Sequence, residues 1–217
     1  YRNEHGKEWL GVVPKEPLVS TPKDLNPDKV SEFIFKYGVG VQNSSMSFRK
    51  EFIKEYLSYL REVKLALDNF IGFLFLFTQQ VMIWNQPLTV YRVGSASASH
   101  RLASLDQFIE HARFYLKINY EDDIVVRNAI KNSGFEELME KRINYKKIAM
   151  KFWSKNPREV KLTWKEILNA APLHKPRMSR GKVLAYYLAS YAPYFLKKKL
   201  IFERYYKREL KKYAMYD

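Results

Sequence analysis

The sequence predicts an all-α protein with an extended N-terminal arm, one long helix and a C-terminal helical module. Three observations predict this class. Apolar residues recur at helical spacing along most of the chain, no stretch alternates as a half-buried strand does, and no internal repeat occurs. We divide the chain into the arm (1–26), a segment with a short helix, the long helix and a loop (27–105), and the C-terminal module (106–217).

The extended arm contains prolines at positions 14, 17 and 22 and has no helical period. Asn26 and Pro27 then supply the N-cap and the first residue of a short helix that ends at Gly38. The loop after it contains two glycines, but it lacks the preceding strand and the Gly-Lys-Ser/Thr sequence of a phosphate-binding loop. We interpret this loop as a hinge.

The long helix is predicted over about 47–84, because no proline interrupts the segment before Pro87. Its first half has one apolar and one charged face, whereas residues 70–84 are apolar on nearly all sides. Such a helix suits a protein core, another subunit or a membrane. A membrane span needs about 20 apolar residues, and Thr78, Gln79 and Gln80 interrupt this shorter run. Burial is therefore favoured, and a span stays the alternative.

The first helix of the C-terminal module is predicted to be capped by Ser104, which forms the pattern of a capping box with Gln107. Glu121, Asp122 and Asp123 fit the first turn of a second helix, where carboxylates offset the positive end of the helix dipole. A role of these acids in acid/base chemistry or metal binding is the alternative, although no histidine lies nearby in the sequence.

Three more helices complete the module. One starts at Phe135 and stops before Pro157, and a short one over 163–169 contains Trp164. The last helix runs from Ser179 toward Tyr213, with a kink at Pro193.

The sequence lacks the pattern of a catalytic or metal site. Ser95, Ser97, Ser99 and His100 lie in a predicted connector without a nucleophile elbow. The four histidines are scattered, and the absence of cysteine excludes disulfides and thiolate metal sites. We therefore expect no enzymatic activity, no metal and no cofactor.

The chain contains 38 Lys and Arg against 23 Asp and Glu, a formal net charge of +15 at pH 7. Such a charge suits nucleic acid, an anionic membrane surface or an acidic protein assembly. Near the C-terminus the cations alternate with Tyr and Phe, which supply stacking faces, so RNA binding is one interpretation and a solvated basic face is another. The residues expected at a lipid or other anionic surface are Arg177, Arg180, Lys182, Lys197, Lys198 and Lys199.

The order of features between residues 121 and 210 resembles a known family. EDDIVVRNAIKN is followed by FEELMEKRINYKKIAMKFW, then by Pro-Arg with LTWKEI, and last by YAPYFLKKKLIFERYYKREL. This order is similar to that of the small matrix-side subunit of the mitochondrial cytochrome bc1 complex, the subunit 7 or cytochrome b-binding family. The matching positions are Ala129, Ile130 and Lys131, then Arg142, Tyr145 and Lys146, then Pro157, Arg158 and Trp164, and finally Pro193 and Tyr194.

The chain departs from the family pattern at three places. The interval from proline to tryptophan is longer, a basic insertion spans 171–182, and lysines replace the acidic C-terminal turn. The resemblance covers under half of the chain, so this would be an enlarged, divergent member.

The resemblance implies a non-catalytic accessory subunit of ubiquinol–cytochrome c reductase (complex III) in the mitochondrial respiratory chain. It implies a location on the matrix side of the inner membrane, with cytochrome b and the core subunits as partners. The partner contacts are expected at Arg142, Tyr145, Trp164, Pro193 and Tyr194. Two alternatives stay open: an accessory subunit of complex I, complex IV or ATP synthase, and an RNA-binding mitochondrial ribosomal protein.

Overall fold

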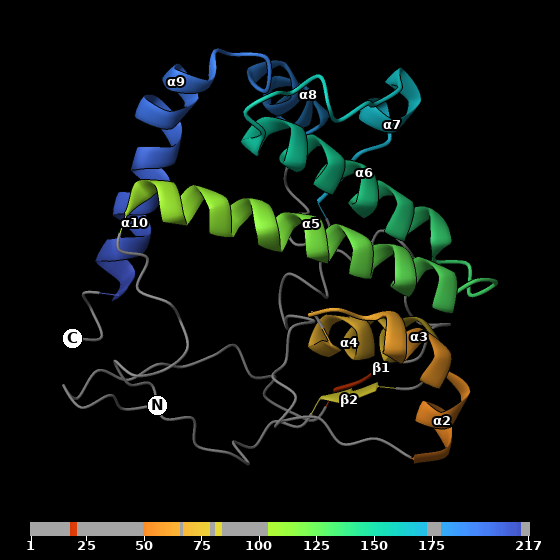
Figure 1. Cartoon of the computed structure of the whole chain (residues 1–217). Coiled ribbons are helices and arrows are strands. Elements are labelled where there is room, and N and C mark those ends of the chain that lie inside the picture. The colour runs from red at the N-terminus through yellow and green to blue at the C-terminus, as the bar shows by residue number, and fades with distance from the viewer. Residues whose placement is uncertain are drawn as a thin grey trace.

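Two long helices, α5 (Leu105–Ala129) and α6 (Glu136–Trp153), lie side by side at the centre of the molecule (Figure 1). The computed structural model describes residues 18–20, 50–65, 67–78, 81–83, 104–172 and 179–213. Apart from the two short strands, helices make up 77% of this part, so the all-α prediction is confirmed. Most of the predicted arm, the short helix after it and the loop over 84–103 lie outside the described residues.

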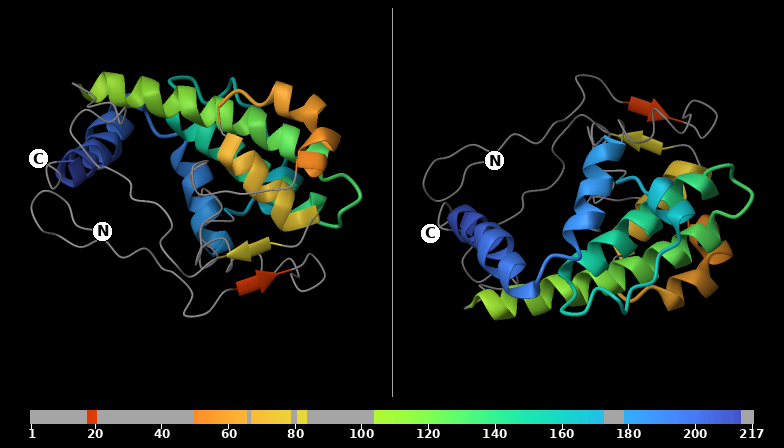
Figure 2. Two further views of the ribbon diagram at one scale, coloured as in Figure 1. Left: turned by 90° about the horizontal axis from the view of Figure 1, so that it is seen from below. Right: turned by 90° about the horizontal axis from the view of Figure 1, so that it is seen from above.

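The remaining helices pack around the central pair. On one side lie α2 (Lys50–Glu55), α3 (Leu57–Glu62) and α4 (Leu67–Thr78), and on the other lie α7 (Trp164–Leu168) and α8 (Arg180–Ala189) (Figure 1). The chain ends its described part with α9 (Tyr194–Lys197), the π-helical turn η2 (Lys198–Phe202) and α10 (Glu203–Tyr213), which contacts α5. Figure 2 shows α8 and the α9–α10 segment extending in different directions from the turn that joins them.

The prediction of one continuous helix over 47–84 is wrong, because the structure divides this segment into α2, α3, α4 and a strand. Val63 is extended, with φ −69° and ψ 125°. The backbone N–H groups of Lys64 and Leu65 donate to the two carboxylate oxygens of Asp122, at 2.8 and 3.2 Å. In a continuous helix these two N–H groups would donate to backbone carbonyls of the preceding turn. Here the carboxylate of Asp122 on α5 accepts both hydrogen bonds instead.

The end of the predicted long helix forms a strand instead. β2 (Val81–Ile83) pairs antiparallel with β1 (Leu18–Ser20), and Val19 lies opposite Met82. This ladder of three residues per strand ties the N-terminal arm to the chain directly after α4.

The apolar helix α4 is a core helix. Six of its side chains are buried, including Phe70, Phe73 and Phe77, and they pack against the C-terminal end of α5 and the start of α6. Aromatic rings join these elements, because Phe77 stacks on Phe135 with ring centroids 4.7 Å apart. Among the described residues, no helix has the length and apolar character to cross a bilayer.

The acidic residues 121–123 lie inside α5 and not at the start of a helix, so the predicted boundary there is wrong. Ser104 caps the helix as expected, since its hydroxyl accepts from the backbone N–H of Gln107 (3.2 Å). The helix then continues to Ala129, and Asn119 donates its side-chain amide to the carbonyl of Tyr115 (2.7 Å) without ending it. Asp122 and Asp123 consequently lie on the buried face of a 25-residue helix.

The helices α6 and α7 agree with the prediction. Phe135 caps α6, and Thr163 caps α7 in a reciprocal capping box with Glu166. The Glu166 carboxylate accepts from Lys147 and from the backbone of Thr163, and these hydrogen bonds lower its pKa to about 2.

The predicted last helix is broken, not kinked, at Pro193. Ser190 ends α8, and Pro193 takes an extended conformation (ψ 136°) as the N-cap of α9. Proline lacks the N–H that a continuing helix requires, which is why the chain begins a new helix here.

The turn η2 explains how two buried side chains five residues apart share one face. Lys197 and Phe202 are both almost completely buried. In an α-helix their directions would differ by about 140°, whereas a π-helical turn, with i to i+5 hydrogen bonds, aligns residues five apart. Phe202 stacks on Trp153 with centroids 4.3 Å apart, so this wide turn brings the last helix onto the end of α6.

Candidate functional site

Eight of the fourteen exposed large apolar side chains in the described part lie between Trp164 and Leu200, on α7, α8, α9, η2 and the turn after α8. Phe195 and Trp164 each expose 67% of their surface, and Leu188 exposes 57%. We use the name α8–η2 surface for the exposed apolar residues Leu184, Leu188, Tyr191, Phe195, Leu196 and Leu200 together with the exposed cations Arg180, Lys182 and Lys199.

The spacing of residues in α8 explains this exposure. Leu184 and Leu188 are four residues apart, which places them on one side of the helix, and Tyr191 follows in the turn after it. Val183 and Tyr187 are buried instead, in the cluster that joins α8 to α6 and α7. α8 therefore has one apolar side against the core and a second one facing outward, which a helix on the surface of an isolated domain does not require.

Aromatic contacts extend the exposed surface onto α7. The ring of Trp164 meets that of Tyr187 edge-on at 6.3 Å, and Tyr187 meets Tyr191 in the same way at 5.5 Å. The two tyrosine hydroxyls are hydrogen-bonded (2.8 Å), and the ammonium of the buried Lys151 lies 4.8 Å from the centre of the Tyr191 ring. The shared hydrogen bond raises the pKa of Tyr187 to about 12, and the same bond, together with Lys151, lowers that of Tyr191.

The charge of this region is of one sign. Between Glu166 and Glu203 the sequence contains no acidic residue. Arg180, Lys182 and Lys199, three of the cations assigned to an anionic surface from the sequence, are exposed. Lys198 is partly covered and forms an ion pair with Asp106 of α5 (2.6 Å), and Arg177 lies outside the described residues.

The assignment of Lys197 to an anionic surface is wrong, because its side chain is only 1% exposed. Its ammonium donates to the carbonyls of Phe152, Ser154 and Ser190, at 2.8, 3.2 and 3.0 Å. These carbonyls lie at the C-terminal ends of α6 and α8, where the last carbonyls of a helix lack partners and a cation is favourable. Burial, and to a lesser extent repulsion from Arg113, lowers the pKa of Lys197 to about 8.

The residues predicted to contact a partner do not gather at one place. Trp164 and Pro193 are exposed, and Tyr145 and Tyr194 are partly buried in aromatic contacts within the protein. The side chain of Arg142 is largely buried. Its guanidinium forms an ion pair with Asp123 (2.8 Å) and lies over the ring of Phe73. Its assignment to a partner contact is therefore wrong.

Asp123 and its two cations form an internal network that sequence reasoning missed. The carboxylate accepts from Arg142 and from Lys146 (2.6 Å), and Lys146 also donates to the carbonyl of Asn119 (2.7 Å). Burial is the main cause that lowers the pKa of Lys146 to about 8. One signal in the sequence was available, because Asp123 is three residues before Val126 and so shares its buried face.

The described residues contain no group of three or more His, Cys, Asp and Glu side chains placed to hold a metal ion. The loop with Ser95, Ser97, Ser99 and His100 lies outside them, as do the glycines 38 and 40. No family model, no curated protein and no solved structure matches this chain. The resemblance to the complex III subunit family therefore rests on the quoted motifs alone.

Proposed function

We propose that this chain is a helical accessory subunit that docks onto the anionic surface of a membrane through its α8–η2 surface. One observation carries the proposal: exposed aliphatic and aromatic side chains occupy a stretch that contains cations and no acids. Apolar side chains favour the boundary between headgroups and acyl chains, and cations favour the anionic headgroups above it.

Exposed cations alone, or exposed apolar residues alone, would not indicate a membrane surface. A basic helix without exposed apolar residues fits a solvated face, and an apolar patch without cations fits a protein interface. Leu188, Phe195 and Leu200 each leave more than half of their surface exposed. Full burial of a wholly exposed side chain of this kind is worth about 1.5–3 kcal/mol, so burial of the exposed part favours binding by roughly half of this amount for each residue. Each nearby Lys or Arg adds about 1 kcal/mol at an anionic membrane surface.

We expect the full chain to float with vesicles that contain phosphatidylglycerol and to bind phosphatidylcholine vesicles weakly. Replacement of Leu188 and Phe195 by serine should weaken vesicle binding at least tenfold, because about 1.4 kcal/mol corresponds to a factor of ten. Replacement of Arg180 and Lys182 by glutamine should weaken it to a similar extent and reduce its dependence on salt. Flotation and titration at several salt concentrations measure both effects.

The matched control is Leu57→Ser on α3, which makes the same chemical change at an exposed leucine outside the α8–η2 surface. Equal binding to neutral and anionic vesicles, or unchanged binding of the Leu188 and Phe195 variant, would contradict the proposal. RNA binding that falls steeply with salt, without vesicle binding, would favour the ribosomal alternative instead.

The finer proposal names the assembly. The resemblance described above makes complex III on the matrix side of the mitochondrial inner membrane the first candidate, with another inner-membrane complex as the alternative. Native isolation of the tagged chain, followed by mass spectrometry of the co-migrating proteins, is expected to recover cytochrome b, and Trp164→Ala should reduce that recovery. Recovery of ribosomal proteins without cytochrome b would contradict this assignment and leave the vesicle result unaffected.

A further inference from the structure

A cleft of about 410 Å³ lies between α5, the end of α6 and the loop after α6. Three cations line it, Arg113, Lys117 and Lys155. The apolar side chains Met150, Trp153 and Val160 form a second part of its wall, and the polar residues Ser154, Asn156 and Glu159 complete it. None of these residues belongs to the α8–η2 surface, so this site is independent of the proposed function.

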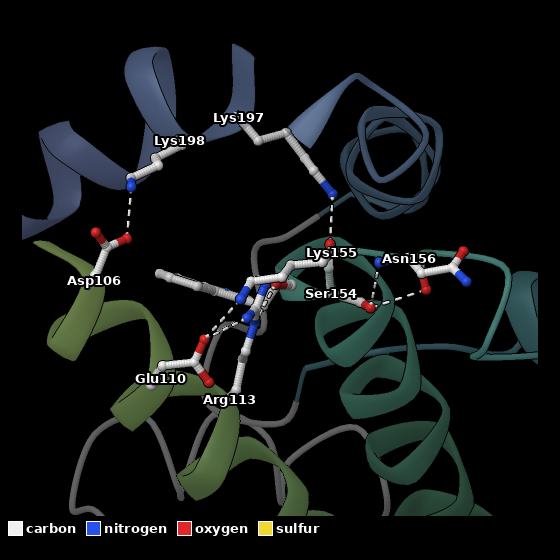
Figure 3. A network of polar contacts seen from close by, with 9 residues as sticks. Asp106, Glu110, Arg113, Ser154, Lys155, Asn156, Lys197 and Lys198 are labelled. Atoms are coloured by element: carbon white, nitrogen blue, oxygen red, sulfur yellow. Dashed lines mark hydrogen bonds and ion pairs between the residues drawn. The ribbon is translucent and has the colours of Figure 1, made fainter. Parts of the chain in front are cut away.

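Arg113 is held rigidly at this cleft (Figure 3). Its Nε donates to the carbonyl of Trp153 (2.8 Å), its Nη1 donates to Glu110 (2.7 Å), and its guanidinium lies over the ring of Tyr194. The third nitrogen, Nη2, is buried and has no hydrogen-bond partner among the described residues. A buried N–H without an acceptor costs about 1–3 kcal/mol, which an anion bound here would recover.

The two lysines of the cleft, Lys155 and Lys117, are exposed to solvent, unlike Arg113. Lys155 is 68% exposed and lies 3.6 Å from Glu110, which already accepts from Arg113. Figure 3 shows Lys155 and Arg113 converging on Glu110, so a ligand that draws Lys155 away from Glu110 uncovers the guanidinium. Lys117 is exposed, one turn along α5 from Arg113.

Positive charge exceeds negative charge around the cleft. Glu159 also lines it and accepts a hydrogen bond from Asn156 (3.3 Å). The buried ammonium of Lys197 adds to the three lining cations, and its repulsion from Arg113 contributes to its lowered pKa. Three cations and one carboxylate, Glu159, therefore line the cleft, while Glu110 and Lys197 lie beside Arg113 without lining it.

We propose that this cleft binds a small organic phosphate ester, whose phosphate oxygens accept from Arg113, Lys117 and Lys155. A phosphate dianion suits three separate cationic donors, because lysines act as point charges and the unpaired Nη2 of the guanidinium supplies directed hydrogen bonds. The organic part of the ester lies against Met150, Trp153 and Val160. The phosphate ester is either a soluble metabolite or the headgroup of a phospholipid.

Isothermal titration of the full chain with sn-glycerol 3-phosphate and with inorganic phosphate tests the proposal. We expect measurable binding of both, tighter for the ester, and a loss of about tenfold in affinity in each of the variants Lys117→Gln and Lys155→Gln. Lys165→Gln is the matched control, because Lys165 is an exposed lysine on α7 that does not line the cleft. Circular dichroism establishes that each variant is folded.

Vesicles of phosphatidic acid in phosphatidylcholine distinguish the two sources. Binding of glycerol phosphate that depends on Lys117 and Lys155 identifies a soluble ester, whereas dependence seen only with phosphatidic acid vesicles identifies a lipid headgroup. Absence of binding in both arms, or equal binding by wild type and both variants, overturns the proposal. Leu188→Ser with Phe195→Ser leaves glycerol phosphate binding intact, which separates this site from the α8–η2 surface.

Discussion

Replacement of Asp123 by asparagine is expected to lower the free energy of unfolding by about 3–5 kcal/mol. The variant keeps the shape of the side chain but removes the charge that Arg142 and Lys146 share at 2.8 and 2.6 Å. Both cations are almost 90% buried, so neither gains water in return. Urea unfolding followed by far-UV circular dichroism measures the loss.

Two further variants make the Asp123 prediction specific. Glu121→Gln removes a carboxylate two residues away whose partner, Lys64, is mostly exposed, and it should leave stability unchanged. Adding Lys146→Met to Asp123→Asn should recover part of the loss, because one fewer buried cation is left without an anion. A small loss in Asp123→Asn, or no recovery in the double variant, would show that the network contributes little.

Replacement of Lys197 by methionine is expected to lower the free energy of unfolding by about 2–4 kcal/mol, because three buried carbonyls lose a charged donor. Methionine keeps the length and apolar stem of the side chain, so lost packing contributes little. Lys199→Met is the control, since Lys199 is exposed two residues away. Equal unfolding midpoints for the two variants would contradict the stabilising role of the hydrogen bonds from Lys197 to the C-terminal carbonyls of α6 and α8.

We also expect the difference in stability between wild type and Lys197→Met to depend on pH. The pKa of Lys197 is about 8 in the folded chain, against an ordinary value of 10.5. A lowered lysine pKa contributes stability above pH 10.5 that is lost as pH falls toward 8. The stability of wild type relative to Lys197→Met should therefore grow between pH 8 and 10, a comparison in which all other groups cancel. A constant difference over this range would contradict the lowered pKa.

The parts of the fold that sequence reasoning predicted are those with local signals. Ser104 and Thr163 each precede a helix by one residue and bond to the backbone three residues on, so the sequence alone contains both partners of the cap. The all-α class follows for the same reason, because apolar periodicity within each helix is local.

The parts that sequence reasoning missed depend on distant partners. The break after α3 requires Asp122, which lies 58 residues further along the chain from Lys64. Nothing near Val63 in the sequence marks this break, since the residues around it are good helix formers. Asp122 and Asp123 likewise predict the first turn of a helix. A pair of acidic residues has the same sequence pattern in a first turn, where it offsets the helix dipole, and on a buried helix face.

The candidate surface was predicted in part. Cations between Arg180 and Lys199 were identified from the sequence, and three of them are exposed. Charge alone does not distinguish Lys197 from Lys199, because only the packing of α9 against α6 and α8 decides which ammonium meets carbonyls and which meets solvent. The cleft around Arg113 was not predicted, since its lining residues come from two helices and a loop that are separate in the sequence.

The wide turn η2 places one more residue between two anchored side chains, Lys197 and Phe202, than an α-helix places between neighbours on one face. Both ends are fixed, one by three carbonyls and the other by Trp153. Removal of one residue between them would leave the anchors four residues apart, and an ordinary α-helix also turns residues at this spacing to one side, about 40° apart. The extra residue therefore widens the outward side of the turn while both anchors keep their partners.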